Sequence, residues 1–230
     1  MPTLMSEMDI GIAEEQFEEL HPVDATGKGY CFVKRAFDFL LSACGLLVLL
    51  IPIALIALVV YIDDPGSVIF SQRRVGKNGE QFRIYKFRTM KMDAPKYMAT
   101  QDVDDPDKYI TRVGHILRKL SLDEIPQLFN VLKGDMSLVG PRPLIPGEET
   151  IHTLRNRFGV YTVRPGVTGL AQINGRDAVS LVDKVRWDVK YVETIGLWND
   201  VKILFATIPK VLGGVGVVEG GCKPEEENKK

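Results

Sequence analysis

The chain has 230 residues, 45% of them hydrophobic and 26% charged, which suits one sizeable core or one domain plus a membrane element. Its formal charge of −1 is unevenly spread: residues 1–25 carry seven acids and no Lys or Arg, which leaves 29 basic and 23 acidic residues for the rest. A basic body suits an anionic partner such as a nucleotide, a phospholipid surface or a nucleic acid, although ordinary surface charge gives the same count. The three cysteines and three histidines are too scattered for a disulfide framework or a zinc site.

The first 30 residues predict an acidic, mobile arm, and residues 31–64 predict a membrane helix. No charge interrupts residues 39–62, which as a helix would be about 36 Å long, against about 30 Å for a hydrocarbon core. Pro52 removes a backbone hydrogen bond near the middle and should kink this helix. Two topologies stay open: a tilted full span, or a helix that bends and returns to the side it entered. Cationic residues on both flanks favour the return.

The catalytic domain predicted for residues 65–218 begins with a β-hairpin. Residues 76–79, Gly-Lys-Asn-Gly, are a strong turn signal between two short apolar segments. In the returning strand, alternation places Ile84, Lys86 and Arg88 on one face. Two neighbouring cations on one face can grip a diphosphate, but a solvated strand face is an equally common explanation.

Residues 118–127 place two adjacent carboxylates at a predicted helix start. Ser121 and Glu124 have the spacing of a capping box, which would put Asp123 in the first helical turn. Unpaired N–H groups and the helix macrodipole there favour an ionised carboxylate and neighbouring phosphates. Asp123 could then be a nucleophile and Glu124 a ligand of a divalent metal; the alternative is a capped surface helix with two solvated acids.

Apolar periods predict further helices at residues 109–119, 149–158, 181–191 and 201–211. Arg112 and Arg118 lie off the apolar stripe of the first. The last follows Trp198, and it fits either an interfacial helix lying on a membrane or a core helix. Residues 219–230 predict a disordered tail. Three Gly- or Pro-rich corners could present cations to an anion, although most such loops do not: Pro141-Arg142-Pro143, Arg164 and Arg176.

Together these residues resemble the monotopic phosphoglycosyl transferases, the bacterial sugar transferase family, in its small single-domain form. The resemblance implies an α/β fold, mostly α with a small β-hairpin or sheet, with a re-entrant kinked membrane helix, a compact catalytic domain and interfacial amphipathic helices. It places the protein on the cytoplasmic face of a bacterial inner membrane. It covers about residues 31–215 in five blocks: Lys-Arg-Ala-Phe-Asp (34–38), Lys-Phe-Arg-Thr-Met (86–90), residues 118–127, Leu-Lys-Gly-Asp-Met-Ser-Leu-Val-Gly-Pro-Arg-Pro (132–143), and Arg-Pro-Gly-Val-Thr-Gly-Leu-Ala-Gln (164–172).

The resemblance implies transfer of a sugar 1-phosphate from a UDP-sugar to polyprenol phosphate, with release of UMP. Asp123 would attack the β-phosphate and form a covalent aspartyl phosphosugar, which the lipid phosphate would then displace. Glu124, together with Asp123, would hold Mg²⁺, but a capping box would compete for the same carboxylate. The other implied site residues are catalytic Lys86 and Arg118, and substrate-binding Arg88, Arg112, Pro141, Arg142, Pro143, Arg164 and Arg176.

One departure concerns the kink. Ile51 precedes Pro52 where better-known members carry Ser, so the freed carbonyl needs another donor, such as Ser42, Cys44 or a neighbouring chain in a homodimer.

Two alternatives to the transferase stay open: a membrane-anchored nucleotide-sugar-binding or scaffold protein, and a two-metal phosphatase. Nucleic-acid binding is disfavoured, because basic residues do not cluster with aromatic ones and the apolar run would be unexplained. The sequence does not identify the sugar.

Overall fold

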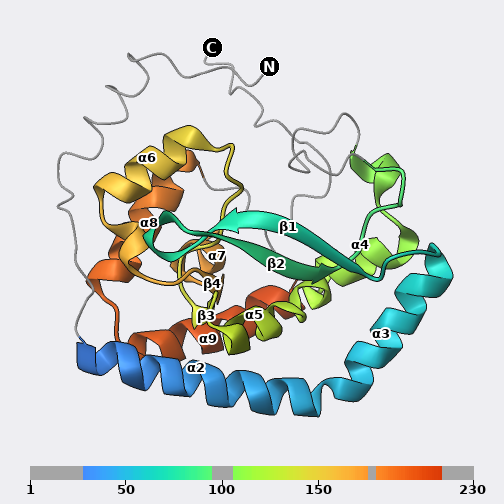
Figure 1. Cartoon of the computed structure of the whole chain (residues 1–230), viewed down its shortest axis with the longest axis horizontal. Coiled ribbons are helices and arrows are strands. Elements are labelled where there is room, and N and C mark those ends of the chain that lie inside the picture. The colour runs from blue at the N-terminus through green and yellow to red at the C-terminus, as the bar shows by residue number, and fades with distance from the viewer. Residues whose placement is uncertain (1–27, 95–105, 176–179, 214–230) are drawn as a thin grey trace.

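The computed structural model describes residues 28–94, 106–175 and 180–213 (Figure 1). The predictions for residues 1–27 of the acidic arm, for the charged tail and for Arg176 lie outside these described residues. The prediction that the arm extends to residue 30 is wrong, because residues 28–30 already belong to helix α2. The described part is mostly helical with two small sheets, in agreement with the predicted α/β class. In chain order its elements are α2 (Lys28–Val48), α3 (Leu50–Asp63), β1 (Ile69–Val75), η1 (Lys77–Gly79), β2 (Gln81–Phe87), η3 (Pro106–Tyr109), α4 (Arg112–Lys119), η4 (Leu122–Glu124), α5 (Gln127–Lys133), β3 (Ser137–Val139), α6 (Glu149–Arg157), η5 (Val160–Thr162), β4 (Gly166–Thr168), α7 (Leu170–Ile173), α8 (Leu181–Glu193) and α9 (Leu197–Leu212).

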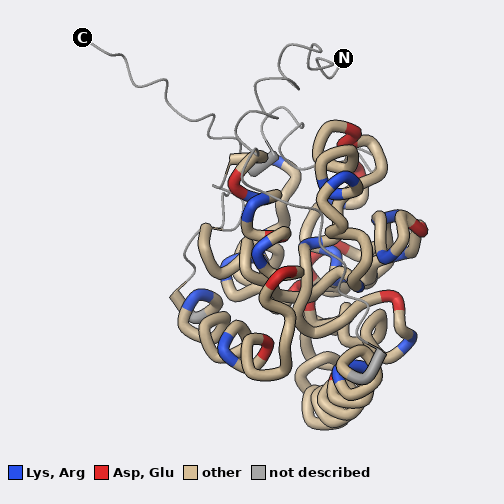
Figure 2. The backbone as a smooth tube through the Cα atoms, turned by 90° about the vertical axis from the view of Figure 1, so that its left-hand side faces the viewer, with Lys and Arg blue, Asp and Glu red and all other residues tan. Residues whose placement is uncertain are grey.

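The predicted membrane helix consists of two helices, α2 and α3, bent by 63°. No single helix in the described ranges is long and apolar enough to cross a membrane, whereas the bent pair qualifies by length and composition. In Figure 2, where charged residues are blue or red, the helix pair is mostly tan. The break lies at Leu49 and not at Pro52, because a proline ring clashes with the carbonyl four residues earlier, here that of Val48. Ser42 donates its hydroxyl to the carbonyl oxygen of Asp38 at 2.6 Å, so this proton is not available to the bend.

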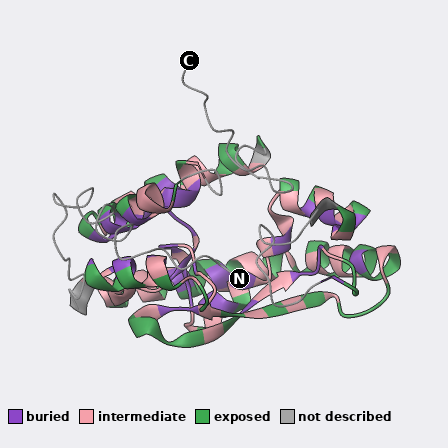
Figure 3. Ribbon diagram, turned by 90° about the horizontal axis from the view of Figure 1, so that it is seen from above, coloured by how far each residue is buried: buried purple, intermediate pink, exposed green. Residues whose placement is uncertain are grey.

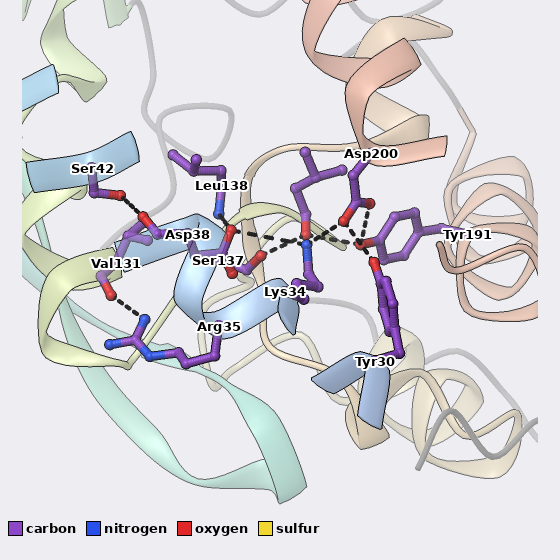
Figure 4. A network of polar contacts seen from close by, with 11 residues as sticks. Tyr30, Lys34, Arg35, Asp38, Ser42, Val131, Ser137, Leu138, Tyr191 and Asp200 are labelled. Atoms are coloured by element: carbon purple, nitrogen blue, oxygen red, sulfur yellow. Dashed lines mark hydrogen bonds and ion pairs between the residues drawn. The ribbon is translucent and has the colours of Figure 1, made fainter. Parts of the chain in front are cut away.

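A buried polar cluster ties the first half of α2 to the last two helices (Figure 4). Lys34 Nζ lies 2.6 Å from Asp200 Oδ2 in α9, and Tyr30 donates its hydroxyl to the same oxygen at 2.8 Å. Tyr191 of α8 donates to the other oxygen, Asp200 Oδ1, at 2.9 Å. Tyr30 and Asp200 are separated by 170 positions in the sequence, so this cluster fixes α2 against the globular part of the chain.

Two more α2 side chains bind backbone groups of neighbouring elements. Asp38 Oδ1 accepts the N–H of Leu138 in β3 at 3.0 Å. Arg35 donates to the carbonyl oxygens of Val131 and Leu132 at 2.5 and 2.8 Å. These carbonyls lie in the last turn of α5, where helix geometry leaves them without partners inside the helix.

The far end of the bent pair is bound to the globular part as well. Asp63 Oδ2 accepts the N–H of Val113 in α4 at 3.1 Å. Asp64 Oδ2 accepts the N–H of Met92 at 3.1 Å and lies 3.3 Å from Arg88 Nη2. Both ends of the bent pair are therefore held by one globular body. Figure 1 shows α2 along the lower edge of the molecule and α3 rising on its right-hand side.

The predicted hairpin is confirmed. Strands β1 and β2 pair antiparallel, and the turn uses positive φ at Asn78 (57°) and Gly79 (77°), which the Asn-Gly sequence allows. The register sets Phe70 opposite Lys86 and Arg74 opposite Phe82. Because directly opposed residues share a face, Arg74 lies on the same face of the hairpin as Lys86.

Part of the core lies where α8 and α9 meet the second sheet, in which β3 and β4 pair parallel. Val139 and Ile203 pack with Tyr191 in one buried cluster, and Leu154 and Val189 belong to another between α6 and α8. Buried positions, purple in Figure 3, line the inward sides of these helices, and exposed positions, green, line the outer sides. The predicted helices at 149–158 and 181–191 are confirmed as α6 and α8.

Helix α9 combines the two alternatives that its sequence left open. Ile203 is buried in the core, whereas Trp198, Phe205 and Ile208 are 71%, 70% and 53% exposed. Lys202 lies 5.7 Å from the centre of the Trp198 ring. A helix with a core-facing side and a large exposed apolar side flanked by cations has the composition of an interfacial helix.

Candidate active site

The two adjacent carboxylates lie in a short turn and not in a capped α-helix. Ser121 has a left-handed conformation (φ 53°) and makes no side-chain cap hydrogen bond, and Leu122–Glu124 forms a single 3₁₀ turn. Helix α5 begins only at Gln127, after Pro126. The predicted capping box is therefore wrong, and Asp123 is not in the first turn of α5. The physical reason is that the Glu124 carboxylate binds cations from distant parts of the sequence and does not accept the N–H of Ser121.

Those cations come from the hairpin and from the loop after β3. Lys86 Nζ lies 2.7 Å from Glu124 Oε1 and 3.9 Å from Asp123 Oδ2. Arg142 Nη2 lies 3.2 Å from the same Glu124 oxygen. Asp123 is only 8% exposed, so its charge depends on these neighbours more than on water.

The same environment separates the ionisation of the two carboxyls. Burial raises the pKa of Glu124, but Lys86 and Arg142 outweigh it and lower this pKa to about 2. For Asp123, burial raises the pKa, Lys86 lowers it and the charge of Glu124 raises it again, so that the net shift is upward. The pair thus consists of a firmly ionised Glu124 and an Asp123 with a more basic, more nucleophilic carboxylate.

Both carboxylates open onto one cavity of about 1300 Å³ between the hairpin, the η4 turn and the end of α9. Among the described residues its lining holds two acids, Asp123 and Glu124, against nine cations. This surplus of positive charge suits an anion with several charges. The nine cations are Arg73, Arg74, Arg83, Lys86, Arg88, Lys91, Arg118, Arg142 and Lys210.

Arg118 and Arg88, two of the predicted site residues, both line this cavity. Arg118 donates its Nε to Thr89 Oγ1 at 2.9 Å. Arg88 is 7% exposed, and its Nη2 donates to the backbone oxygen of Asp64, at the end of α3. The Nε and Nη1 of Arg88 have no hydrogen-bond partner among the described residues, so two buried donors remain for a ligand.

A family model described as bacterial sugar transferase matches residues 29–214. The chain belongs to the bacterial sugar transferase family. It is 40% identical over 195 residues to a UDP-galactose-lipid carrier transferase of Erwinia amylovora, a match over 79% of this chain and 40% of the relative. It is 43% identical over 196 residues to UDP-N-acetylgalactosamine-undecaprenyl-phosphate N-acetylgalactosaminephosphotransferase of Aeromonas hydrophila, over 81% of this chain and 45% of the relative.

The chain therefore spans less than half the length of these two relatives. A third relative has a more similar length: the exopolysaccharide production protein ExoY of Rhizobium meliloti (strain 1021) is 40% identical over 192 residues, which are 77% of this chain and 84% of the relative. The family resemblance predicted from the sequence blocks is thus confirmed.

Four other predicted residues do not line the main cavity. Arg112 is exposed and does not line the cavity. Arg164 donates its Nε to the carbonyl oxygen of Gly134 at 2.8 Å, at the C-terminal end of α5. The carbonyl of Pro141 accepts the N–H of Gly166 at 2.9 Å, and Pro143 lines a small side cavity of about 20 Å³ behind Glu124. Their predicted contacts with substrate stay predictions.

The structure adds three polar residues that the sequence reasoning missed. Arg74 Nε, Gln127 Nε2 and both amide atoms of Gln172 are buried without a hydrogen-bond partner in the described part of the chain, and all three residues line the main or the side cavity. Burial and the charge of Arg142 lower the pKa of Arg74 to about 10. The hairpin register, which places Arg74 on the Lys86 face, could have identified Arg74 beforehand.

The donor set is suited to Mg²⁺ but is small. No group of three or more His, Cys, Asp or Glu side chains that could hold a metal occurs in the described ranges. Two adjacent carboxylates offer hard oxygen ligands, and Mg²⁺ commonly takes one or two carboxylates together with substrate phosphates and water. Asp123 and Glu124 therefore fit an ion that arrives with a diphosphate better than a permanent metal centre.

Proposed function

We propose that the protein transfers a sugar 1-phosphate from a UDP-sugar to polyprenol phosphate and releases UMP. The observation that carries this proposal is the pair of carboxylates in a cavity lined by nine cations. Such a positively charged lining is complementary to the negative charge of a nucleoside diphosphate sugar. The names of two relatives state lipid-linked sugar or sugar-phosphate transfer, which supports the same reaction here.

In the first step an Asp123 carboxylate oxygen attacks the β-phosphorus of the donor. The bond between this phosphorus and the oxygen bridging to the α-phosphate breaks, and UMP leaves with the electron pair. Burial raises the pKa of Asp123 and makes its carboxylate the stronger nucleophile of the pair. Lys86, at 3.9 Å from Asp123, and Arg118, whose charge also acts on Asp123, stabilise the charge that develops on the phosphoryl oxygens.

In the second step a phosphate oxygen of polyprenol phosphate attacks the same phosphorus. The bond to the Asp123 oxygen breaks, the carboxylate is restored, and polyprenyl-diphosphate-sugar is formed. Glu124 stays ionised throughout, since its pKa is about 2, and together with Asp123 it would hold Mg²⁺. When bound, Mg²⁺ neutralises phosphate charge.

The bent helix pair supports a re-entrant membrane anchor. We propose that this anchor lies in a bacterial inner membrane with the globular part on the cytoplasmic face. Lys34 binds α9 at one end of the pair, and Asp63 binds α4 at the other. Because one globular body holds both ends, the pair enters and leaves on the same side. Its exposed apolar side chains, among them Leu47 (75%), Ile51 (71%) and Ile62 (68%), face away from that body and suit lipid.

The test is UMP release from UDP-galactose, UDP-glucose and their N-acetylated forms, with Mg²⁺ or EDTA, before and after addition of polyprenol phosphate. We expect a burst near one UMP per active site without acceptor, turnover with acceptor, and loss of both in Asp123→Asn and in EDTA. Asp93→Asn, at an exposed acid outside the cavity lining, is the matched control and should behave as wild type. Turnover by Asp123→Asn would exclude it as the nucleophile, and a silent wild type that still binds UDP-sugars would indicate a scaffold.

A further inference from the structure

A buried ion pair far from the carboxylates reaches the active site through the backbone of Arg142. Arg155 of α6 lies 2.5 Å from Asp188 of α8 through its Nη2, and the two side chains are 3% and 2% exposed. The Nη1 of Arg155 donates to the carbonyl oxygen of Arg142 at 2.8 Å. The Arg142 side chain in turn lies 3.2 Å from Glu124. A chain of direct contacts thus runs from α8 to the catalytic carboxylate.

The same loop is held at two more carbonyls. His152, one helical turn before Arg155, contacts the carbonyl oxygen of Ile145 through its Nε2 at 2.7 Å. The N–H of Val75 in β1 donates to the carbonyl oxygen of Leu144 at 2.9 Å. The other side of this loop lines the main cavity, through Arg142 and residues 145–147. The loop is therefore a cavity wall that α6 and β1 hold in place from behind.

The ion pair lies beside an apolar cluster that includes Leu154 and Val185. Burying two charges in such a place is costly, and apolar residues of similar size often stabilise a fold as well or better. What an apolar pair cannot do is donate a hydrogen bond to the Arg142 carbonyl. The cost of burying the two charges therefore offsets much of what the pair contributes to stability, whereas the hydrogen bond to the Arg142 carbonyl needs a donor at position 155.

We propose that Arg155 and Asp188 are positioning residues that set the Arg142 guanidinium against Glu124 and the phosphates of the donor. Asp188 orients the guanidinium group of Arg155. This group, through its hydrogen bond to the Arg142 carbonyl, fixes the backbone from which the Arg142 side chain extends. The inference deepens the proposed function and rests on it. Because displacement of a charged group by about 1 Å can cost roughly a hundredfold in rate, loss of this support should lower donor kcat/KM by roughly tenfold or more.

The test uses the apolar double variant Arg155→Met/Asp188→Leu in the full chain, in detergent or lipid. Its Tm should equal or exceed that of wild type, while kcat/KM for UMP release from the UDP-sugar falls at least tenfold. In an Arg142→Ala background, the same two substitutions should cause no further loss. Tyr191→Phe is the matched control, since it also changes a buried polar group of α8, and its effect should be the same with and without Arg142.

The outcomes separate the inference from the proposed function. A wild type that releases no UMP from any donor refutes the proposed function. If wild type is active and the stable double variant keeps its kcat/KM, or if its loss adds fully to that of Arg142→Ala, the positioning role is overturned. If the double variant has a lower Tm than wild type, Asp188→Asn is measured as well, because asparagine retains the shape of the aspartate side chain. Asp188→Asn should then lower kcat/KM. For the inference to stand, this loss must also disappear in the Arg142→Ala background.

Discussion

Asp200→Ala should be among the most destabilising single substitutions outside the active site. Asp200 is 2% exposed and accepts three hydrogen bonds, from Lys34 at 2.6 Å, Tyr30 at 2.8 Å and Tyr191 at 2.9 Å. Removing it leaves a Lys34 ammonium whose side chain is only 13% exposed, and breaking a buried ion pair typically costs 3–5 kcal/mol. Asp38 stays 4.0 Å from Lys34 and offsets part of this, so we expect about 3 kcal/mol.

For a chain of this size, about 1 kcal/mol corresponds to a Tm change of roughly 2–4 °C, so Tm should fall by about 6–12 °C. The measurement is thermal unfolding followed by tryptophan fluorescence in detergent. Asp183→Ala is the control: it removes a half-exposed ion pair with Arg186 at 3.5 Å and an exposed hydrogen bond from the Ser180 hydroxyl, and should cost about 1 kcal/mol.

Replacing both charges, as Lys34→Met/Asp200→Leu, should recover most of the lost Tm, since no unpaired charge then remains. A fall of less than about 3 °C in Asp200→Ala, corresponding to roughly 1 kcal/mol, would refute the view that this cluster fixes α2 to the globular part. A double variant no more stable than Asp200→Ala would mean that lost packing, and not an unpaired Lys34, explains the effect.

Two further predictions concern pH and packing. Burial raises the pKa of Asp123 and Lys86 lowers it, so Lys86→Gln should raise this pKa further. Because the nucleophile must be ionised, donor kcat/KM is lost as the pH falls, and in Lys86→Gln this loss should occur at a higher pH than in wild type. A shift of the loss to lower pH would contradict the assignment of Asp123. A Cβ at Gly114 would lie 2.1 Å from the carbonyl oxygen of Thr89, so Gly114→Ala should cost about 1–3 kcal/mol or more, measured as a lower Tm. Gly147→Ala, where a Cβ would meet nothing within 4 Å, is the control and should leave Tm unchanged.

Much of the local structure could be predicted because its causes are local. The Asn78-Gly79 turn defines the hairpin through backbone conformations that few other residues adopt. The helix predicted at 109–119 is observed as α4, and it begins where Thr111 Oγ1 accepts the N–H of Gly114 at 2.9 Å. The bend of the membrane pair was predicted at Pro52 and lies three residues earlier, at Leu49, because a proline acts on the preceding turn.

The capping box failed for the opposite reason. Its Ser-x-x-Glu spacing is a local pattern, but the energy of the Glu124 carboxylate depends on Lys86 and Arg142, which are 38 and 18 residues away in the sequence. Two cations outweigh one backbone N–H as partners of a buried carboxylate. Arg155 and Asp188 had no local signal at all, because a buried ion pair between two helices resembles two ordinary surface charges in the sequence.

The sequence by itself determined the long uncharged run, the hairpin, the periodic helices and the blocks that identify the family, since each depends on neighbouring residues or on a short repeat. Only the tertiary structure decided which cations meet Asp123 and Glu124, and that both ends of the bent helix pair are bound to one body. Such contacts join residues as far apart as Tyr30 and Asp200, separated by 170 positions. Their free energy arises from burial and charge in the folded state, which no local pattern of residues records.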